Sequence, residues 1–216
     1  MSEPSRVLIV DDHPIVRQGL SALIDQQQEL VLCGEAANVN EALRVLASSR
    51  PDLLIVDVSL KGESGIDLIK QIKANERRVK VLVCSIHEDL YFAERALNAG
   101  ALGYVNKQEA TDRLLDAIRT VLDGRVYLAP KMVARLLQRA VGSAAHASDP
   151  VDRLTDRELE IVELIGKALT TSEIAETLHL SPKTVETHRE HIKAKLTLRN
   201  GAELTRWAVQ WVLERT

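Results

Sequence analysis

Short apolar runs alternate with segments of helical periodicity along the first 124 residues of this 216-residue chain. Each run is about as long as a buried strand, and the segment after it has apolar positions at helical spacing. Five such repeats are typical of a parallel sheet with helices on both faces, and right-handed crossovers leave few arrangements for them. We predict a flavodoxin-like, doubly wound α/β fold with the strand order 2-1-3-4-5. The predicted strands are 7–10, 31–35, 53–57, 79–85 and 103–105, and the predicted helices are 14–26, 39–48, 64–74, 88–98 and 109–123.

The alternation ends after Gly124, and the elements predicted beyond it are all helices. A short helix over 130–141 precedes the small and polar residues of 142–150, which are typical of a linker. The pattern therefore divides the chain into three parts. They are an α/β domain over 1–124, a linker with a short helix over 125–151 and an all-α domain of four helices over 152–216.

The helix starts in the last part are marked by caps. Capping boxes begin at Thr155 and Thr170, and Ser181 is followed by a proline at the first helical position. The helices predicted near 171–178 and 182–196 are separated by three residues only, and a last helix is predicted near 200–213. Two short helices joined by so tight a turn are typical of a helix-turn-helix.

Three carboxylates lie where two of the apolar runs end. Asp11 and Asp12 follow the first predicted strand, and Asp57 ends the third. The predicted strand order makes these strands neighbours at the switch point of the sheet, where ligands bind beyond the carboxyl ends of the strands. A cluster of acids repels itself unless a cation holds it, and hard oxygen ligands suit Mg²⁺. The sequence thus predicts a metal-assisted phosphoryl site.

Further strand ends supply the groups that phosphoryl transfer needs. Asp57 stands alone at the centre of the edge and is our candidate nucleophile, because a carboxylate can form an acyl phosphate once the transferred charge is neutralised. Lys107 after the fifth strand supplies a positive charge, and Ser85 at the end of the fourth supplies a hydroxyl donor. Every strand end except the second contributes. Taken singly, each could be a solvated turn residue or a helix cap, but their coincidence on matching strand ends favours a site.

The helix predicted over 182–196 has two distinct faces. Val185, His188, Ile192 and Leu196 are spaced to pack inward. The opposite face carries side chains that can contact phosphates or base edges in DNA, although a solvated polar face is the plain alternative. These candidate DNA-binding residues are Lys183, Thr184, Glu186, Thr187, Glu190 and Lys193.

Two further features of this domain have alternative interpretations. His188-x-x-His191 has a spacing at which two imidazoles could share a metal ion, but the sequence offers no third ligand nearby, so we do not predict a metal site there. On the last helix, Leu204, Trp207, Ala208 and Trp211 form an apolar stripe that fits either a second copy of the chain or the helix's own domain.

Charge and composition limit the classes of partner. The first 124 residues carry more acidic than basic residues, and the remainder slightly more basic ones. So small a basic excess predicts weak non-specific binding to DNA, which a two-fold homodimer on paired half-sites would remedy. No apolar run is long enough to span a membrane and no signal peptide is recognisable, so we expect a cytoplasmic protein without a membrane partner.

Taken together, these motifs resemble a known family. Residues 7–123, with V-L-I-V-D-D-H, L-L-I-V-D, V-C-S and G-Y-V-N-K, resemble the receiver domain of two-component response regulators. Residues 152–213, with T-V-E-T-H-R and a later K-L, resemble the LuxR-type helix-turn-helix. The whole chain is similar to a response regulator of the NarL/FixJ family.

The resemblance implies a phosphorylation switch. A sensor histidine kinase would phosphorylate Asp57, with Mg²⁺ held by Asp11, Asp12, Asp57 and the backbone carbonyl of Ser59. Ser85 would then move toward the phosphoryl group, and Tyr104 would turn inward into the vacated space. The output would be binding to promoter DNA as a dimer, with RNA polymerase as a further candidate partner.

Two alternatives remain at this point. One is a receiver that works by protein contact without phosphorylation, against which the complete acidic, serine and lysine set argues. The other is an aspartyl-phosphate phosphatase, but those enzymes place an acid two residues after the nucleophile, where this chain has Ser59, so we expect no enzyme activity of that kind. The chain also departs from many receivers in having Gln108 after Lys107 and the bulky Ile86 after Ser85.

Overall fold

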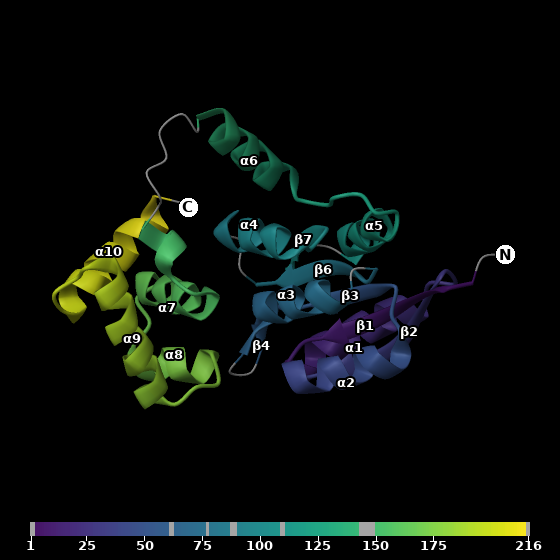
Figure 1. Cartoon of the computed structure of the whole chain (residues 1–216), viewed down its shortest axis with the longest axis horizontal. Coiled ribbons are helices and arrows are strands. Elements are labelled where there is room, and N and C mark those ends of the chain that lie inside the picture. The colour runs from purple at the N-terminus through teal and green to yellow at the C-terminus, as the bar shows by residue number, and fades with distance from the viewer. Residues whose placement is uncertain are drawn as a thin grey trace. The chain divides into compact units, whose positions relative to one another are not determined.

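The computed structural model describes residues 3–60, 63–76, 78–86, 90–108, 111–142 and 150–214. The chain divides into two compact units, Met1–Val141 and Gly142–Thr216, which are described separately (Figure 1). No helix among the described residues is both long and apolar enough to cross a membrane.

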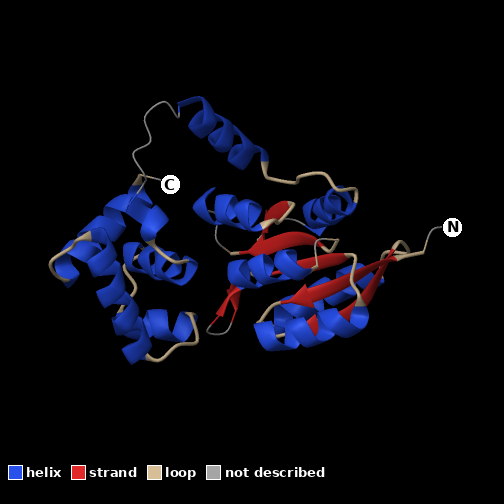
Figure 2. Cartoon of the chain, viewed as in Figure 1, coloured by secondary structure: helices blue, strands red, loops and turns tan. Residues whose placement is uncertain are grey.

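The N-terminal unit contains a five-stranded parallel sheet with the order β2-β1-β3-β6-β7. This is the predicted order, and Figure 2 shows the strands between helices. Strands β3 and β7 are buried along their whole length, as expected where both faces of a sheet are covered. The strands are β1 Ser5–Val10, β2 Leu30–Ala36, β3 Leu53–Val56, β6 Lys80–Ser85 and β7 Gly103–Asn106.

Five helices cover this sheet: α1 Pro14–Asp25, α2 Val39–Ser49, α3 Gly65–Asn75, α4 Leu90–Ala99 and α5 Thr111–Leu122. On one face, Ile24 of α1 and Ile118 of α5 share a core with Val7 and Ile55 of the sheet. On the other, α2 approaches β2 so closely at Gly34 that a Cβ there would lie 2.4 Å from Val45. The predicted helix starts at 88 and 109 lie outside the described residues.

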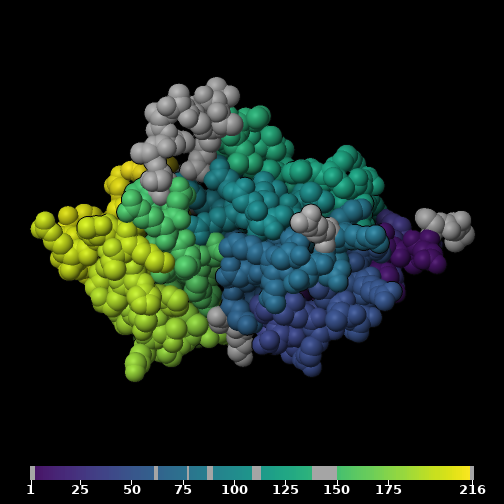
Figure 3. Space-filling model, in the orientation of Figure 1, coloured from purple at the N-terminus to yellow at the C-terminus, as the bar shows by residue number. Residues whose placement is uncertain are grey.

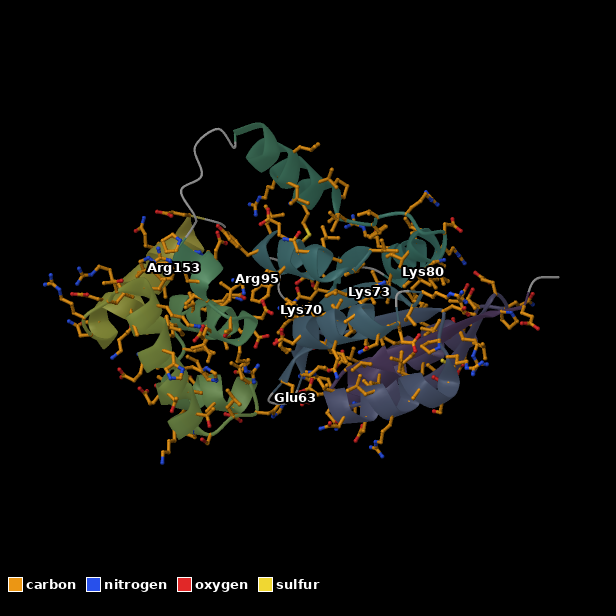
Figure 4. The ribbon with its side chains drawn as sticks, in the orientation of Figure 1. Glu63, Lys70, Lys73, Lys80, Arg95 and Arg153 are labelled. Atoms are coloured by element: carbon orange, nitrogen blue, oxygen red, sulfur yellow. The ribbon has the colours of Figure 1, made fainter. Side chains whose placement is uncertain are left out.

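A small hairpin after β3 was not predicted. Its strands, β4 Ser59–Leu60 and β5 Glu63–Ser64, pair antiparallel. The carboxylate of Glu63, labelled in Figure 4, accepts a hydrogen bond of 3.1 Å from the backbone N–H of Val39 at the start of α2. The hairpin thereby attaches the segment after Asp57 to the neighbouring helix.

Helix α6, Pro130–Gly142, follows the sheet, close to the predicted span. Before it, the backbone N–H of Tyr127 donates to Leu102 and its carbonyl accepts from Tyr104, so this residue extends the β7 edge. That pairing was not predicted either. Residues 143–149 of the predicted linker lie outside the described residues.

The C-terminal unit is helical, as predicted. A short 3₁₀ helix, Pro150–Arg153, precedes α7 Asp156–Gly166, α8 Thr171–Thr177, α9 Pro182–Leu196 and α10 Gly201–Leu213. Both capping boxes form, and the Ser181 hydroxyl accepts from the N–H of Thr184 at the start of α9. Helices α8 and α9 are joined by a tight turn in which His179 has a positive φ of 52°, and they pack together as a helix-turn-helix.

Candidate functional site

The three predicted carboxylates meet at the carboxyl edge of the sheet. Val10 of β1 pairs with Val56 of β3, and the backbone N–H of Asp57 donates to the carbonyl of Val10 over 2.9 Å. Each of Asp11, Asp12 and Asp57 offers a carboxylate oxygen, and these lie within 4.8 Å of one another and of a ring nitrogen of His13. Asp11 and Asp57 are each only 2% exposed. Such close, buried oxygens match the hard ligand set that Mg²⁺ requires, so the residues present fit that ion.

Lys107 lies between two of these acids. Its Nζ is 2.5 Å from Oδ2 of Asp57 and 2.7 Å from Oδ2 of Asp11. Burial lowers the pKa of Lys107, but the two carboxylates outweigh that effect and leave its pKa raised. The backbone N–H of Lys107 also donates to the carbonyl of Ser85, over 2.8 Å. The site therefore contains a permanent positive charge beside the candidate nucleophile.

Ser85 and Tyr104, the two predicted switch residues, lie on neighbouring strands. Ser85 is the last residue of β6 and is fully buried, and Tyr104 lies on β7. Tyr104 is only 1% exposed. The ring already occupies the interior, the position that the resemblance assigns to the phosphorylated form.

Ser59 lies two residues after Asp57 and pairs with Ser64 in the β4-β5 hairpin. This return of the chain brings the start of α3 against Asp57. A Cβ on Gly65 would lie 1.8 Å from the carbonyl oxygen of Asp57, which no side chain could tolerate. Gly65 is therefore a part of the site that the sequence reasoning missed.

Residues of α1 and β2 support the acidic cluster from outside it, although the second strand supplies none of the cluster's carboxylates. A guanidinium N–H of Arg17 donates to the backbone carbonyl of Asp11 over 2.6 Å, and its Nε lies 3.4 Å from a carboxylate oxygen of Glu35 on β2. Ser21 donates to the other oxygen of Glu35 over 2.6 Å. Spacing alone could not assign this role to Arg17, because it depends on the return of β2 beside α1.

His13 is the other residue that was missed. Its Nδ1 lies 2.8 Å from Oδ1 of Asp12 and 3.3 Å from Oδ1 of Asp11, and its backbone N–H donates to Asp11. The signal was present in the motif, where His13 follows the paired acids directly, but the same position also directly precedes α1 and is typical of a helix flank.

The two faces of α9 are largely as predicted. Val185 and Ile192 are fully buried, whereas His188 and Leu196 are only partly buried. Lys183, Glu186, Thr187 and Glu190 are exposed, and Thr184 and Lys193 are intermediate. Figure 3 shows α9 and α10, in yellow-green and yellow, at the surface of the C-terminal unit.

Some candidate DNA-binding side chains already have partners within the unit. The Thr184 hydroxyl is 2.7 Å from that of Ser181, so it belongs to the cap. Glu186 accepts from the Thr171 hydroxyl of α8 over 2.7 Å. Lys193 donates to Glu190 over 2.8 Å. Contact with a base would require these side chains to exchange partners, while Lys183 offers a positive charge at the helix start.

The apolar stripe on α10 is mostly internal. Leu204 and Ala208 are fully buried and Trp211 is 4% exposed, so the alternative of a partner surface made by all four residues is corrected, and these three pack within their own domain. The cause is the packing of α10 on α7, where a Cβ on Gly166 would lie 2.6 Å from the carbonyl oxygen of Ala208. Trp207 alone of the four is partly exposed, and it stacks on Trp211 with ring centroids 6.4 Å apart.

The fold and this edge define a class of protein. A doubly wound sheet with clustered acids and a lysine at its switch point, on one chain with a helix-turn-helix, is the architecture of a DNA-binding response regulator. Residues 7–119 match the family model of the response regulator receiver domain, and residues 152–208 match that of the luxR family of bacterial regulatory proteins. The chain therefore belongs to the NarL/FixJ family of two-component response regulators. Both models describe regulatory domains, so the protein is a regulator and not a phosphatase.

Relatives match the chain over almost its whole length. The oxygen regulatory protein NreC of Staphylococcus epidermidis is 35% identical over 211 residues, which cover 95% of this chain and 97% of that protein. NreC of Staphylococcus carnosus is 36% identical over 210 residues, with the same coverage.

Solved structures of the same family are similar to this one. The RcsB response regulator of Salmonella typhimurium superposes with a TM-score of 0.65 at 26% identity, covering 97% of this chain and 98% of that one. RcsB bound to promoter rprA in the presence of the phosphomimetic BeF₃⁻ superposes with a TM-score of 0.61 at 27% identity, covering 96% and 99%.

Proposed function

We propose that Asp57 accepts a phosphoryl group from a sensor histidine kinase and that its phosphorylation controls dimerisation and sequence-specific binding to promoter DNA. The observation that carries the proposal is the buried cluster of Asp57, Asp11 and Asp12 with Lys107 bridging two of the three. In this reading residues 1–124 form the receiver, 125–151 the linker and 152–216 the DNA-binding domain.

Each residue of the cluster has its own role in phosphoryl transfer. A carboxylate oxygen of Asp57 forms a bond to phosphorus while the bond from phosphorus to the donor's histidine nitrogen breaks, and the imidazole leaves with the electron pair. Asp11, Asp12 and Asp57 would hold Mg²⁺, as would the Ser59 carbonyl that the family implies. When bound, the ion neutralises charge on the transferred group. Lys107 then moves its donors from Asp57 to a phosphoryl oxygen, and Ser85 donates its hydroxyl to another.

The new hydrogen bonds from Lys107 and Ser85 to the phosphoryl group would stabilise the active conformation of the receiver relative to the inactive one. Moving a two-state equilibrium from mostly off to mostly on requires about 5 kcal/mol of differential stabilisation, and a phosphoryl dianion with charge-assisted bonds can provide it. We expect Ser85 to move toward the phosphoryl group and phosphorylation to hold Tyr104 in the interior position that it already occupies, because both residues lie in strands that end at the site.

The output proposal rests on the polar face of α9. The weak positive charge of the domain makes a dimer necessary for tight binding. The side chains that would contact phosphates and base edges are those of Lys183, Thr184, Glu186, Thr187, Glu190 and Lys193. Part of the dimer contact would come from Trp207, the partly exposed member of the α10 stripe. We propose that the protein acts in the cytoplasm, where promoter DNA and RNA polymerase are found.

The proposal is tested by DNA binding with and without a small-molecule phosphodonor and Mg²⁺. Wild-type protein should bind selected promoter fragments more tightly after phosphorylation, and Asp57→Asn should lose that gain. Asp116→Asn, at an exposed position on α5, is the matched control and should keep it. An undiminished gain in Asp57→Asn would overturn the role of Asp57, and equal binding of the wild type with and without the phosphodonor would favour a receiver that works without phosphorylation.

A further inference from the structure

A second group of metal-binding side chains lies in the C-terminal unit, away from the acidic cluster. Glu158 of α7 and the histidines His188 and His191 of α9 each offer a ligand atom, and these atoms lie within 4.8 Å of one another. Sequence spacing offered no third ligand for the histidine pair, so that expectation is corrected. The third ligand comes from a different helix, which only the folded packing of α7 against α9 brings close.

The positions of Glu158, His188 and His191 suit the binding of a cation. Histidines three residues apart share one face of a helix, and Glu158 is the acid of the first capping box. Its Oε2 accepts from the backbone N–H of Thr155 over 2.7 Å and from Lys195 over 2.6 Å, and neither of these two bonds uses Oε1. Burial lowers the pKa of His188, and a neutral imidazole is the form that binds metal.

We propose that Glu158, His188 and His191 form a zinc site that links the start of α7 to the DNA-binding helix α9. Two imidazoles and one carboxylate with an open fourth position are a ligand set that suits Zn²⁺. Mg²⁺ prefers oxygen ligands and should not compete here. His191 is exposed, which leaves a path for the ion and room for water as the fourth ligand.

The charged side chains around the proposed site limit its affinity for Zn²⁺. Lys195 neutralises Glu158, and the guanidinium of Arg157 lies near enough to His188 to disfavour added positive charge. Zn²⁺ binding should therefore be moderate and should weaken as pH falls and the histidines compete for protons. Bound ion would stabilise the C-terminal unit, because the ligands come from two helices that separate on unfolding.

The test uses the full-length protein in saturating Mg²⁺, so that the acidic cluster of the receiver is occupied. Zn²⁺ binding is measured by calorimetry, and Co²⁺ is used as a visible-absorption probe of histidine ligation. Unfolding of the C-terminal unit is followed by tryptophan fluorescence, since both tryptophans of the chain, Trp207 and Trp211, belong to it. Wild type should bind one Zn²⁺ and gain thermal stability.

His191→Ala should bind Zn²⁺ at least about tenfold more weakly, since loss of even a supporting contact of a metal ligand costs that much. His179→Asn removes an exposed histidine of the same unit at a position with positive φ, which Asn tolerates, and should bind as wild type does. Equal Zn²⁺ affinity of wild type and His191→Ala, or binding that Mg²⁺ abolishes, would overturn the site. If His191→Ala unfolds at a lower temperature than the wild type in EDTA, His191→Gln is used instead for the comparison of Zn²⁺ affinity with the wild type.

Discussion

At the scale of single residues, Lys107 has two opposing effects on the site. Its ammonium neutralises Asp57 and Asp11, which are otherwise buried negative charges in close contact. The same ammonium occupies carboxylate oxygens that a metal ion would use. Lys107 therefore stabilises the resting cluster and competes with the cation that phosphoryl transfer needs.

We predict that Lys107→Met binds Mg²⁺ about tenfold more tightly than wild type, because a competing positive charge is removed from a site of low dielectric constant. Its phosphorylation should nevertheless be slower, since the transferred group loses a charge partner. Calorimetry with Mg²⁺ and the rate of phosphorylation by a small donor measure the two effects. Lys70→Met, an exposed lysine of α3 labelled in Figure 4, is the control and should change neither. Weaker Mg²⁺ binding in Lys107→Met would contradict this account.

Gly65 is the second residue whose substitution should affect both stability and Mg²⁺ binding. A methyl group there would overlap the carbonyl of Asp57, so Gly65→Ala must move either the start of α3 or the nucleophile. We expect a loss of roughly 1–3 kcal/mol in the free energy of unfolding, the usual cost of overpacking, together with weakened Mg²⁺ binding. Urea unfolding followed by circular dichroism measures the stability.

Gly19→Ala provides the matched control for that measurement. Gly19 lies on an exposed face of α1 with nothing within 4 Å of the added methyl group, so the substitution should stabilise the helix by up to about 1 kcal/mol. If Gly65→Ala were as well tolerated as Gly19→Ala, close packing of α3 against Asp57 would be refuted.

At the scale of elements, the caps of the C-terminal unit have more than a local effect. The Thr155 hydroxyl accepts from the N–H of Glu158, and Glu158 in turn binds Lys195 of α9. Burial raises the pKa of Glu158, but the hydrogen bonds from Lys195 and Thr155 outweigh it and lower the pKa overall. The capping box thus helps to orient a carboxylate that joins two helices.

We predict that Thr155→Ala destabilises the C-terminal unit by about 1 kcal/mol or slightly more, as loss of an N-cap does, with an added contribution from the loosened Glu158. Urea unfolding monitored by tryptophan fluorescence measures it. Thr205→Ala, at an exposed position inside α10, should have a much smaller effect. Equal losses in the two variants would mean that the cap has no special role.

His188 makes the stability of the same unit depend on pH. Burial lowers its pKa from 6.5, helped by Arg157 of α7 and by His191 and Lys195 of α9, and opposed by Glu158 of α7. Because the folded pKa is depressed, this stability is present above pH 6.5 and is lost as the pH falls through the folded pKa. The stability that Glu158 contributes through its own lowered pKa is present above its ordinary pKa of 4.5 and is lost only below it, so a window between pH 7 and pH 5 isolates the histidine.

We therefore expect the thermal midpoint of tryptophan fluorescence, measured in EDTA, to fall from pH 7 to pH 5 in the wild type. The fall should be smaller in His188→Gln, which does not titrate, and unchanged in His179→Asn. A pH dependence in His188→Gln equal to that of the wild type would show that another group is responsible.

Elements were predictable where a repeating pattern was long enough to be recognised. The strand order followed from the alternation of strands and helices and from the right-handed crossovers between parallel strands. The starts of α7, α8 and α9 followed from the capping residues Thr155, Thr170 and Ser181. The β4-β5 hairpin has two residues per strand and therefore no periodicity, and the pairing of Tyr127 depends on the open edge of β7. Contacts between elements, such as Arg17 with Glu35 or Glu158 with His188, needed the fold.

At the scale of the whole molecule, the sequence places a charged site and a DNA-binding surface in two separate units. The acidic trio was predictable because strand ends of one sheet must converge. Burial of the α10 stripe was not predictable, because an apolar helix face fits its own domain and a partner equally well. Regulation requires that chemistry at Asp57 in one unit alters binding by α9 in the other.

The central claim is that Asp57 is the phosphoacceptor, and the most direct measurement is the intact mass of the protein after incubation with a small phosphodonor and Mg²⁺. We predict the addition of a single phosphoryl group, located by peptide mapping to Asp57, absent in Asp57→Asn and absent in the wild type when EDTA removes the metal. A protein that takes up no phosphoryl group, or takes it up at another residue while Asp57 stays unmodified, would contradict the account.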